Sequence, residues 1–182
     1  ILVITVASWV EYSRSRARRG EGAAVSAPVL SPWWPTVTLV WVCIQGAFGA
    51  LTVTMKLFPA IVTLHLVGGL VLLFLLCAQA VRRTQTVQGV APVPVPTAVR
   101  RWLWGAFVLL CAQVVLGGWV STNYAVLACT EFPGCQGSLW PPMDFRQGFQ
   151  IWRELGMLQD GSYISFAGLT AIHYAHRLFA YV

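Results

Sequence analysis

Long hydrophobic runs alternate with polar segments along this chain, and their lengths predict membrane-spanning helices. A helix needs roughly 20 residues to cross the hydrocarbon core of a bilayer. Three complete runs reach that length, at about residues 34–54, 60–81 and 102–122. The run at 1–10 is about half a span, and a last run begins near Ile164 and continues to the end of the sequence. We therefore expect an all-α integral membrane protein built as a helical bundle.

The composition agrees with a membrane protein. Of the 182 residues, 57% are hydrophobic and 10% are charged, and the mean hydropathy is +0.68. A soluble domain carries roughly 25% charged residues, so this chain has too little polar surface for water. The sequence starts and stops inside hydrophobic runs, without an initial Met or a recognisable secretory signal, so we expect a fragment of a longer membrane protein.

Basic residues are concentrated in two of the segments between the runs. The segments 11–32 and 82–101 together hold eight of the twelve Lys and Arg residues. The positive-inside rule places such segments in the cytoplasm, so 55–59 and 123–163 are expected outside. This distribution explains the net charge of +6 through membrane topology. It predicts the lipid bilayer as a partner, and not nucleic acid.

Two segments between the runs have compositions that predict their conformations. Alternating prolines make 82–101 an extended linker. The segment 123–163 is too aromatic for a solvated tether, so we expect it to fold over the outer face. Within it, Trp152 and its neighbours are predicted to form a short amphipathic helix at the membrane interface.

The three histidines all lie in hydrophobic runs, His65 in the run 60–81 and His173 and His176 in the last run. An ionisable side chain within a membrane helix is costly, so it usually faces a bundle interior and has a function. Neutral imidazole is a good axial ligand for haem iron; the alternative is a hydrogen bond to a neighbouring helix. His173 and His176 share a helix face, so one can ligate while the other supports it. Arg177 is a candidate partner for a haem propionate, with a snorkelling side chain or an ion pair as the alternative.

Two cysteines lie in the segment 123–163, and the other three lie in the hydrophobic runs. Cys129 and Cys135 are separated by five residues that include Pro133 and Gly134. In an oxidising compartment this spacing predicts a disulfide. A zinc site is disfavoured because no histidine in the segment completes a ligand set, and a redox-active pair lacks the C-x-x-C spacing.

Two of the runs share a pattern of glutamine and glycine. Gln45 is followed by Gly49, and Gln113 by Gly117, with hydroxyl residues further on in both runs. The match suggests an internal repeat. The two glutamines are expected to make hydrogen bonds between helices.

Taken together, five stretches of this sequence resemble the haem A synthase family, namely 45–54, 63–69, 113–137, 140–145 and 173–177. The resemblance implies an eight-helix membrane protein made of two tandem four-helix halves. It also implies an oxidoreductase that converts the methyl group at position 8 of haem O to a formyl group. The product is haem A for cytochrome c oxidase, and haem b serves as cofactor.

The resemblance divides the chain into three parts. Residues 1–81 correspond to the end of the N-terminal half, on the substrate-haem side, and 82–101 to a cytoplasmic linker. Residues 102–182 correspond to the start of the C-terminal half, on the haem b side, including the external segment 123–163.

The same resemblance assigns the iron ligands. His65 matches the fourth-helix histidine of the family and His176 the sixth-helix histidine, each serving a different haem. The partner histidines of the second and eighth helices lie outside this sequence, as does an acidic residue near the second-helix histidine. His173 has no counterpart in the ligand set, and no residue of the chain is a convincing general base.

The resemblance also implies partners, and two other functions compete with the one that it implies. The resemblance implies haem O as substrate, haem O synthase and cytochrome oxidase assembly factors as candidate partners, a homo-oligomer as a candidate assembly, and the bacterial cytoplasmic (inner) membrane as location. A di-haem, cytochrome b-like electron-transfer subunit would use the same histidines. A thiol oxidoreductase would instead work through Cys129 and Cys135.

Overall fold

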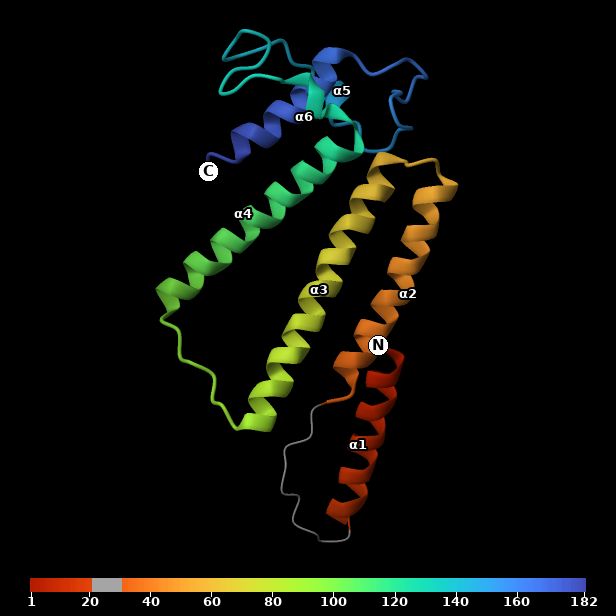
Figure 1. Cartoon of the computed structure of the whole chain (residues 1–182), viewed down its shortest axis with the longest axis vertical. Coiled ribbons are helices and arrows are strands. Elements are labelled where there is room, and N and C mark those ends of the chain that lie inside the picture. Colours follow the sequence, from red (N-terminus) through yellow and green to blue (C-terminus); the bar gives the residue numbers. More distant parts are fainter. Residues whose placement is uncertain (21–30) are drawn as a thin grey trace. The chain divides into compact units, whose positions relative to one another are not determined.

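The computed structural model describes residues 1–20 and 31–182, and within that part it contains helices and no named strand. This confirms the predicted all-α fold. Figure 1 shows the helices in chain order: α1 (Leu2–Gly20), α2 (Trp33–Thr54), α3 (Pro59–Gln88), α4 (Thr97–Thr122), the 3-10 turn η1 (Ala125–Ala128), α5 (Phe145–Gly148) and α6 (Phe166–Phe179).

Among the described residues, α2, α3 and α4 are the helices long and apolar enough to cross a membrane. They coincide with the three complete hydrophobic runs, which confirms the predicted integral membrane character. Large side chains such as Phe74 and Trp102 are exposed on these helices. Extended apolar surface of this kind is what a lipid-facing helix presents.

Several predicted helix ends are wrong, because the helices continue through their terminal arginines. The hydrophobic pattern predicts an end near residue 81, whereas α3 continues to Gln88. Likewise α1 reaches Gly20 instead of ending near residue 10, and α4 begins at Thr97 instead of 102. Arginine is a good helix former, so the end of a hydrophobic run marks the edge of the membrane and not the end of the helix.

The extended linker is therefore confined to the proline-rich residues 90–96. At the end of α3, Gly89 adopts a φ of +66°. The Val90 N–H donates to the Gln85 carbonyl over 3.0 Å. This is the hydrogen bond of a Schellman motif, which glycine permits because it has no Cβ.

The described chain forms two compact units, and the long helices α2 and α3 contribute to both. One unit comprises Ile1–Ala47 and Gly68–Pro94. In it, the Trp9 indole N–H donates to the Thr36 hydroxyl over 3.0 Å, which joins α1 to α2. The Trp41 indole N–H donates to the Gly68 carbonyl over 2.8 Å, which joins α2 to α3.

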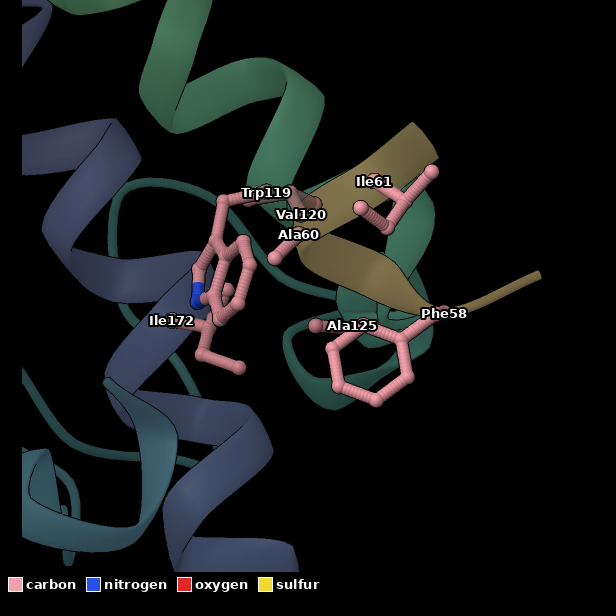
Figure 2. Packing of buried hydrophobic residues seen from close by; sticks show 7 residues of the cluster. All are labelled: Phe58, Ala60, Ile61, Trp119, Val120, Ala125 and Ile172. Carbon is pink, nitrogen blue, oxygen red and sulfur yellow. The ribbon is translucent and has the colours of Figure 1, made fainter. Parts of the chain in front are cut away.

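The second unit comprises Phe48–Val67 and Val95–Val182 and contains the larger core. Figure 2 shows Trp119 of α4 beside Ile172 of α6, with residues of α3 and η1 around them; the seven buried members are Phe58, Ala60, Ile61, Trp119, Val120, Ala125 and Ile172. The Trp119 indole N–H donates to the carbonyl of Gly148 over 2.9 Å. The core thus ties α5 and α6 to the ends of the long helices.

The segment 123–163 is folded against this core, as its aromatic content predicts. The predicted helix around Trp152 is wrong, because the short helix is α5, earlier in the segment. Asp144 caps α5, its carboxylate accepting a hydrogen bond from the Gln147 N–H at 3.0 Å. The carboxylate of an N-cap residue fixes where a helix starts, and the amphipathic pattern near Trp152 lacks such a signal.

Replacing Trp119 with phenylalanine tests the role of its indole N–H. Trp119→Phe keeps an aromatic ring in the core but leaves the Gly148 carbonyl without its donor. We expect the free energy of unfolding to fall by about 1–2 kcal/mol, measured by denaturant titration in detergent micelles. Trp104→Phe on the exposed surface of the same helix is the control, and an equal loss in both variants would contradict the assignment.

Candidate functional site

His176 lies on α6 with its imidazole against the backbone of α4. A methyl group added at Gly117 would come within 3.0 Å of the His176 Cε1 atom, so the ring occupies the space that glycine leaves. The Gln113 side-chain amide donates to the His176 carbonyl over 3.2 Å, which confirms an interhelical hydrogen bond for this glutamine. Gln113 and Gly117, one turn apart on α4, thus fix both the backbone and the ring of His176.

One nitrogen of His176 is buried without a partner. Among the described residues, none forms a hydrogen bond with its Nδ1 atom. A buried polar atom that lacks a partner costs free energy and calls for an explanation, as do Oε1 of Gln113 and Nε of Arg153. The ring is half-buried and its position is fixed by glycine, which suits an imidazole that carries an axial ligand bond.

His65 on α3 also lies against a glycine of another helix. A methyl group added at Gly49 of α2 would come within 3.2 Å of the His65 Cε1 atom and 3.7 Å of its Nε2 atom. Gly49 follows Gln45 by four residues, as Gly117 follows Gln113. The sequence repeat therefore corresponds to two similar cradles, each formed by a glycine that receives an imidazole from another helix.

His173 has both ring nitrogens engaged. Its Nδ1 atom lies 3.0 Å from the Ala125 carbonyl, and its Nε2 atom accepts from the Arg177 Nε–H over 3.1 Å. Since the guanidinium can only donate, Nε2 carries no proton and Nδ1–H is the donor to Ala125. In this arrangement the imidazole joins α6 to η1 and has no nitrogen left for a metal.

Arg177 holds the loop that contains the two cysteines. Its Nη2 donates to the Cys129 carbonyl over 2.9 Å, and its Nη1 donates to the carbonyls of Gly134, over 3.0 Å, and Glu131. With the bond to His173, four of the five N–H groups of the guanidinium are used. One N–H remains for another acceptor, such as the propionate that the sequence suggests.

The disulfide predicted from the sequence is present. Cys129 and Cys135 are joined, with their Cα atoms 4.8 Å apart, and both residues are buried. The Gln136 side-chain amide donates to the Thr170 hydroxyl of α6 over 2.7 Å, and the Tyr174 hydroxyl donates to the Leu139 carbonyl. The disulfide loop is therefore fastened to one face of α6, which also carries His173 and Arg177.

Arg153 is a structural residue that the sequence did not reveal. It is 3% exposed, and its guanidinium donates to the Asn123 side chain and, over 3.3 Å, to the Met157 carbonyl. Burial lowers the pKa of Arg153. Its neighbours Trp152 and Glu154 are exposed, so no local pattern distinguishes it from a surface arginine.

The chain matches the family model COX15-CtaA, described as cytochrome oxidase assembly protein, over residues 1–182. The haem A synthase of Shewanella oneidensis is 33% identical over 156 residues, which cover 81% of this chain and 44% of the relative. The haem A synthase of Symbiobacterium thermophilum is 30% identical over 125 residues, covering 65% of this chain and 41% of the relative. The chain thus spans less than half the length of these curated relatives. No solved structure matches it.

Gly117→Ala tests the cradle around His176. The added Cβ would lie 3.0 Å from the imidazole, so the ring must move. We expect a changed histidine environment, observed as a shift of the His176 ring resonances in a selectively labelled sample. Gly105→Ala is the control on the same helix, because no atom lies within 4 Å of its added Cβ. Equal shifts in both variants would contradict the cradle.

Arg177→Gln tests the fastening of the disulfide loop. The change removes donors to three loop carbonyls, and hydrogen bonds from a charged donor each contribute about 1.5–3 kcal/mol. We expect the Cys129–Cys135 bond to be reduced at least tenfold faster by dithiothreitol, followed by mass spectrometry after alkylation. Arg146→Gln on α5 is the control for lost positive charge. An unchanged reduction rate for Arg177→Gln would show that the loop holds without this side chain.

Proposed function

Since this chain belongs to the COX15-CtaA family of cytochrome oxidase assembly proteins, we propose that its full-length protein is a haem A synthase. In this proposal the protein oxidises the C8 methyl group of haem O to a formyl group and so makes haem A for cytochrome c oxidase. A bound haem b supplies the redox chemistry as cofactor. The chain's residues supply binding and orientation.

The observation that carries the proposal is the cradle of His176. Its imidazole rests against Gly117, and its Nδ1 atom is buried without a hydrogen-bond partner among the described residues. A histidine that only stabilised the helix pair would use its nitrogens for hydrogen bonds, as His173 does. His176 thus fits the role of an axial ligand to haem iron better than its neighbour on α6.

We assign the two cradles to two different haems. His65 on α3 would hold the substrate haem within the N-terminal half, residues 1–81, and His176 would hold haem b within the C-terminal half, residues 102–182. Two separate glycine cradles, on α2 and α4, support this assignment. A substrate must enter and leave whereas a cofactor stays, so one iron site does not serve both.

His173 and Arg177 have a positioning role in this proposal. They connect α6 to η1 and to the disulfide loop, so they fix the rotation of the helix that carries His176. The remaining N–H of the Arg177 guanidinium is available to a haem propionate. The disulfide loop would then form a lid at the outer end of the site.

The proposal includes a membrane topology and partners. The basic segments 11–32 and 82–101 would lie in the cytoplasm, and 55–59 and 123–163 outside a bacterial cytoplasmic membrane. Haem O synthase is the natural source of the substrate, and assembly factors of cytochrome oxidase would receive the product. A homo-oligomer is compatible with the exposed apolar helix surfaces.

Pigment analysis of histidine variants of the full-length protein tests the proposal. His176→Ala is expected to remove most of the haem b, whereas His65→Ala should retain haem b and lose most of the conversion of haem O to haem A. Extracted haems are separated by reversed-phase chromatography. Leu178→Ala is the matched control, because it alters an exposed side chain of the same helix to which we assign no role.

Two results would overturn parts of this proposal. Preparations that contain haem b and never haem O or haem A would identify a di-haem electron-transfer subunit. Loss of all haem in both alanine variants would show that His65 and His176 bind the same iron.

A further inference from the structure

A cavity of about 270 Å³ lies between α1, α2 and α3 at the arginine-rich end of the first unit. None of its lining residues belongs to either histidine cradle, and the proposed haem chemistry does not use it. Its apolar lining residues are Ile4 and Ala7 of α1 and Trp34 and Pro35 of α2. Its polar lining residues include two arginines of α3, Arg82 and Arg83.

Arg82 is the cation that is available to a ligand. Its guanidinium lies 4.6 Å from the centre of the Trp34 ring, and no described residue forms a hydrogen bond or ion pair with it. Cation–π stacking fixes the position of the guanidinium plane, while the N–H groups at its edge remain able to donate hydrogen bonds. Arg82 therefore presents donors to the cavity from a fixed position.

Arg83 is a weaker second cation. It pairs with Glu11 of α1 at 3.3 Å, and both side chains are about half exposed, at 53% and 49%. An exposed pair of this kind contributes little and can exchange partners. Arg14 and Arg18 follow Glu11 at helical spacing on α1, so positive charge exceeds negative charge at this end.

We propose that this cavity binds one anionic phospholipid, with the phosphate at Arg82 and Arg83 and an acyl chain along Ile4, Ala7 and Trp34. The shared chemistry is a phosphate group attached to a hydrocarbon chain. Basic pockets between membrane helices on the cytoplasmic side recognise anionic headgroups in this way. The lining of the cavity includes no residue of either histidine cradle. Failure of lipid binding and failure of haem A synthase activity can therefore be told apart.

Lipid retention by the full-length protein tests the site. The protein is purified in detergent and incubated with phosphatidylglycerol, phosphatidylcholine or inorganic phosphate, and bound species are counted by native mass spectrometry. We expect one phosphatidylglycerol to be retained, with at least tenfold preference over phosphatidylcholine. Binding of inorganic phosphate alone, or equal retention of the two lipids, would overturn the proposal.

Two pairs of variants distinguish lipid binding in the cavity from general electrostatic attraction to the protein surface. Arg82→Gln should weaken phosphatidylglycerol binding about fivefold, since each basic residue near a membrane surface contributes on the order of 1 kcal/mol. Arg100→Gln, at the other end of the same basic segment and outside the cavity, should not. An equal effect of both changes would show that only net charge matters.

The apolar wall is tested without changing charge. Ala7→Phe should fill part of the cavity and reduce retention of phosphatidylglycerol, while Ala106→Phe on the exposed surface of α4 is the control. Ala7 is exposed, so folding of the variant is not at risk, and thermal unfolding verifies this. Unchanged retention in Ala7→Phe would place the lipid elsewhere.

Discussion

Hydrogen bonding of backbone carbonyls is the constraint on which this structure depends. Inside a helix these groups are satisfied locally, which is why helices can cross a membrane. The segment between α4 and α6 is mostly irregular, and several of its carbonyls accept hydrogen bonds from side chains. Arg177 satisfies three of them, and Trp119 and Tyr174 satisfy one each. Donors on the two flanking helices thus hold part of this irregular segment in place.

This constraint also separates the two histidines of α6. His173 faces the irregular segment and is used as a donor and an acceptor within it. His176, three residues later, faces the glycine of α4 instead. A single turn of helix therefore carries one imidazole that stabilises the fold and one whose buried nitrogen lacks a partner among the described residues. The division follows from what each side chain meets and could not be decided from their shared helix face.

Hydropathy located the three complete spans because apolar length is a property of the local sequence. The pairing of Cys129 with Cys135 was also predictable, since few residues separate them. The continuation of α3 through Arg82 was not, because hydropathy marks the limit of the membrane while the backbone obeys helix propensity. The loop carbonyls that Arg177 binds lie more than forty residues away in sequence, so only the folded chain brings them together.

The two glycine cradles have a mechanical consequence. A ring that rests on another helix's backbone has its position set by the separation of the two helix axes, with no intervening side chain to absorb a change. Membrane helices adjust their tilt to the thickness of the surrounding bilayer. We therefore expect a change in helix tilt to move the imidazoles of His65 and His176, so that the lipid environment affects where their nitrogens lie.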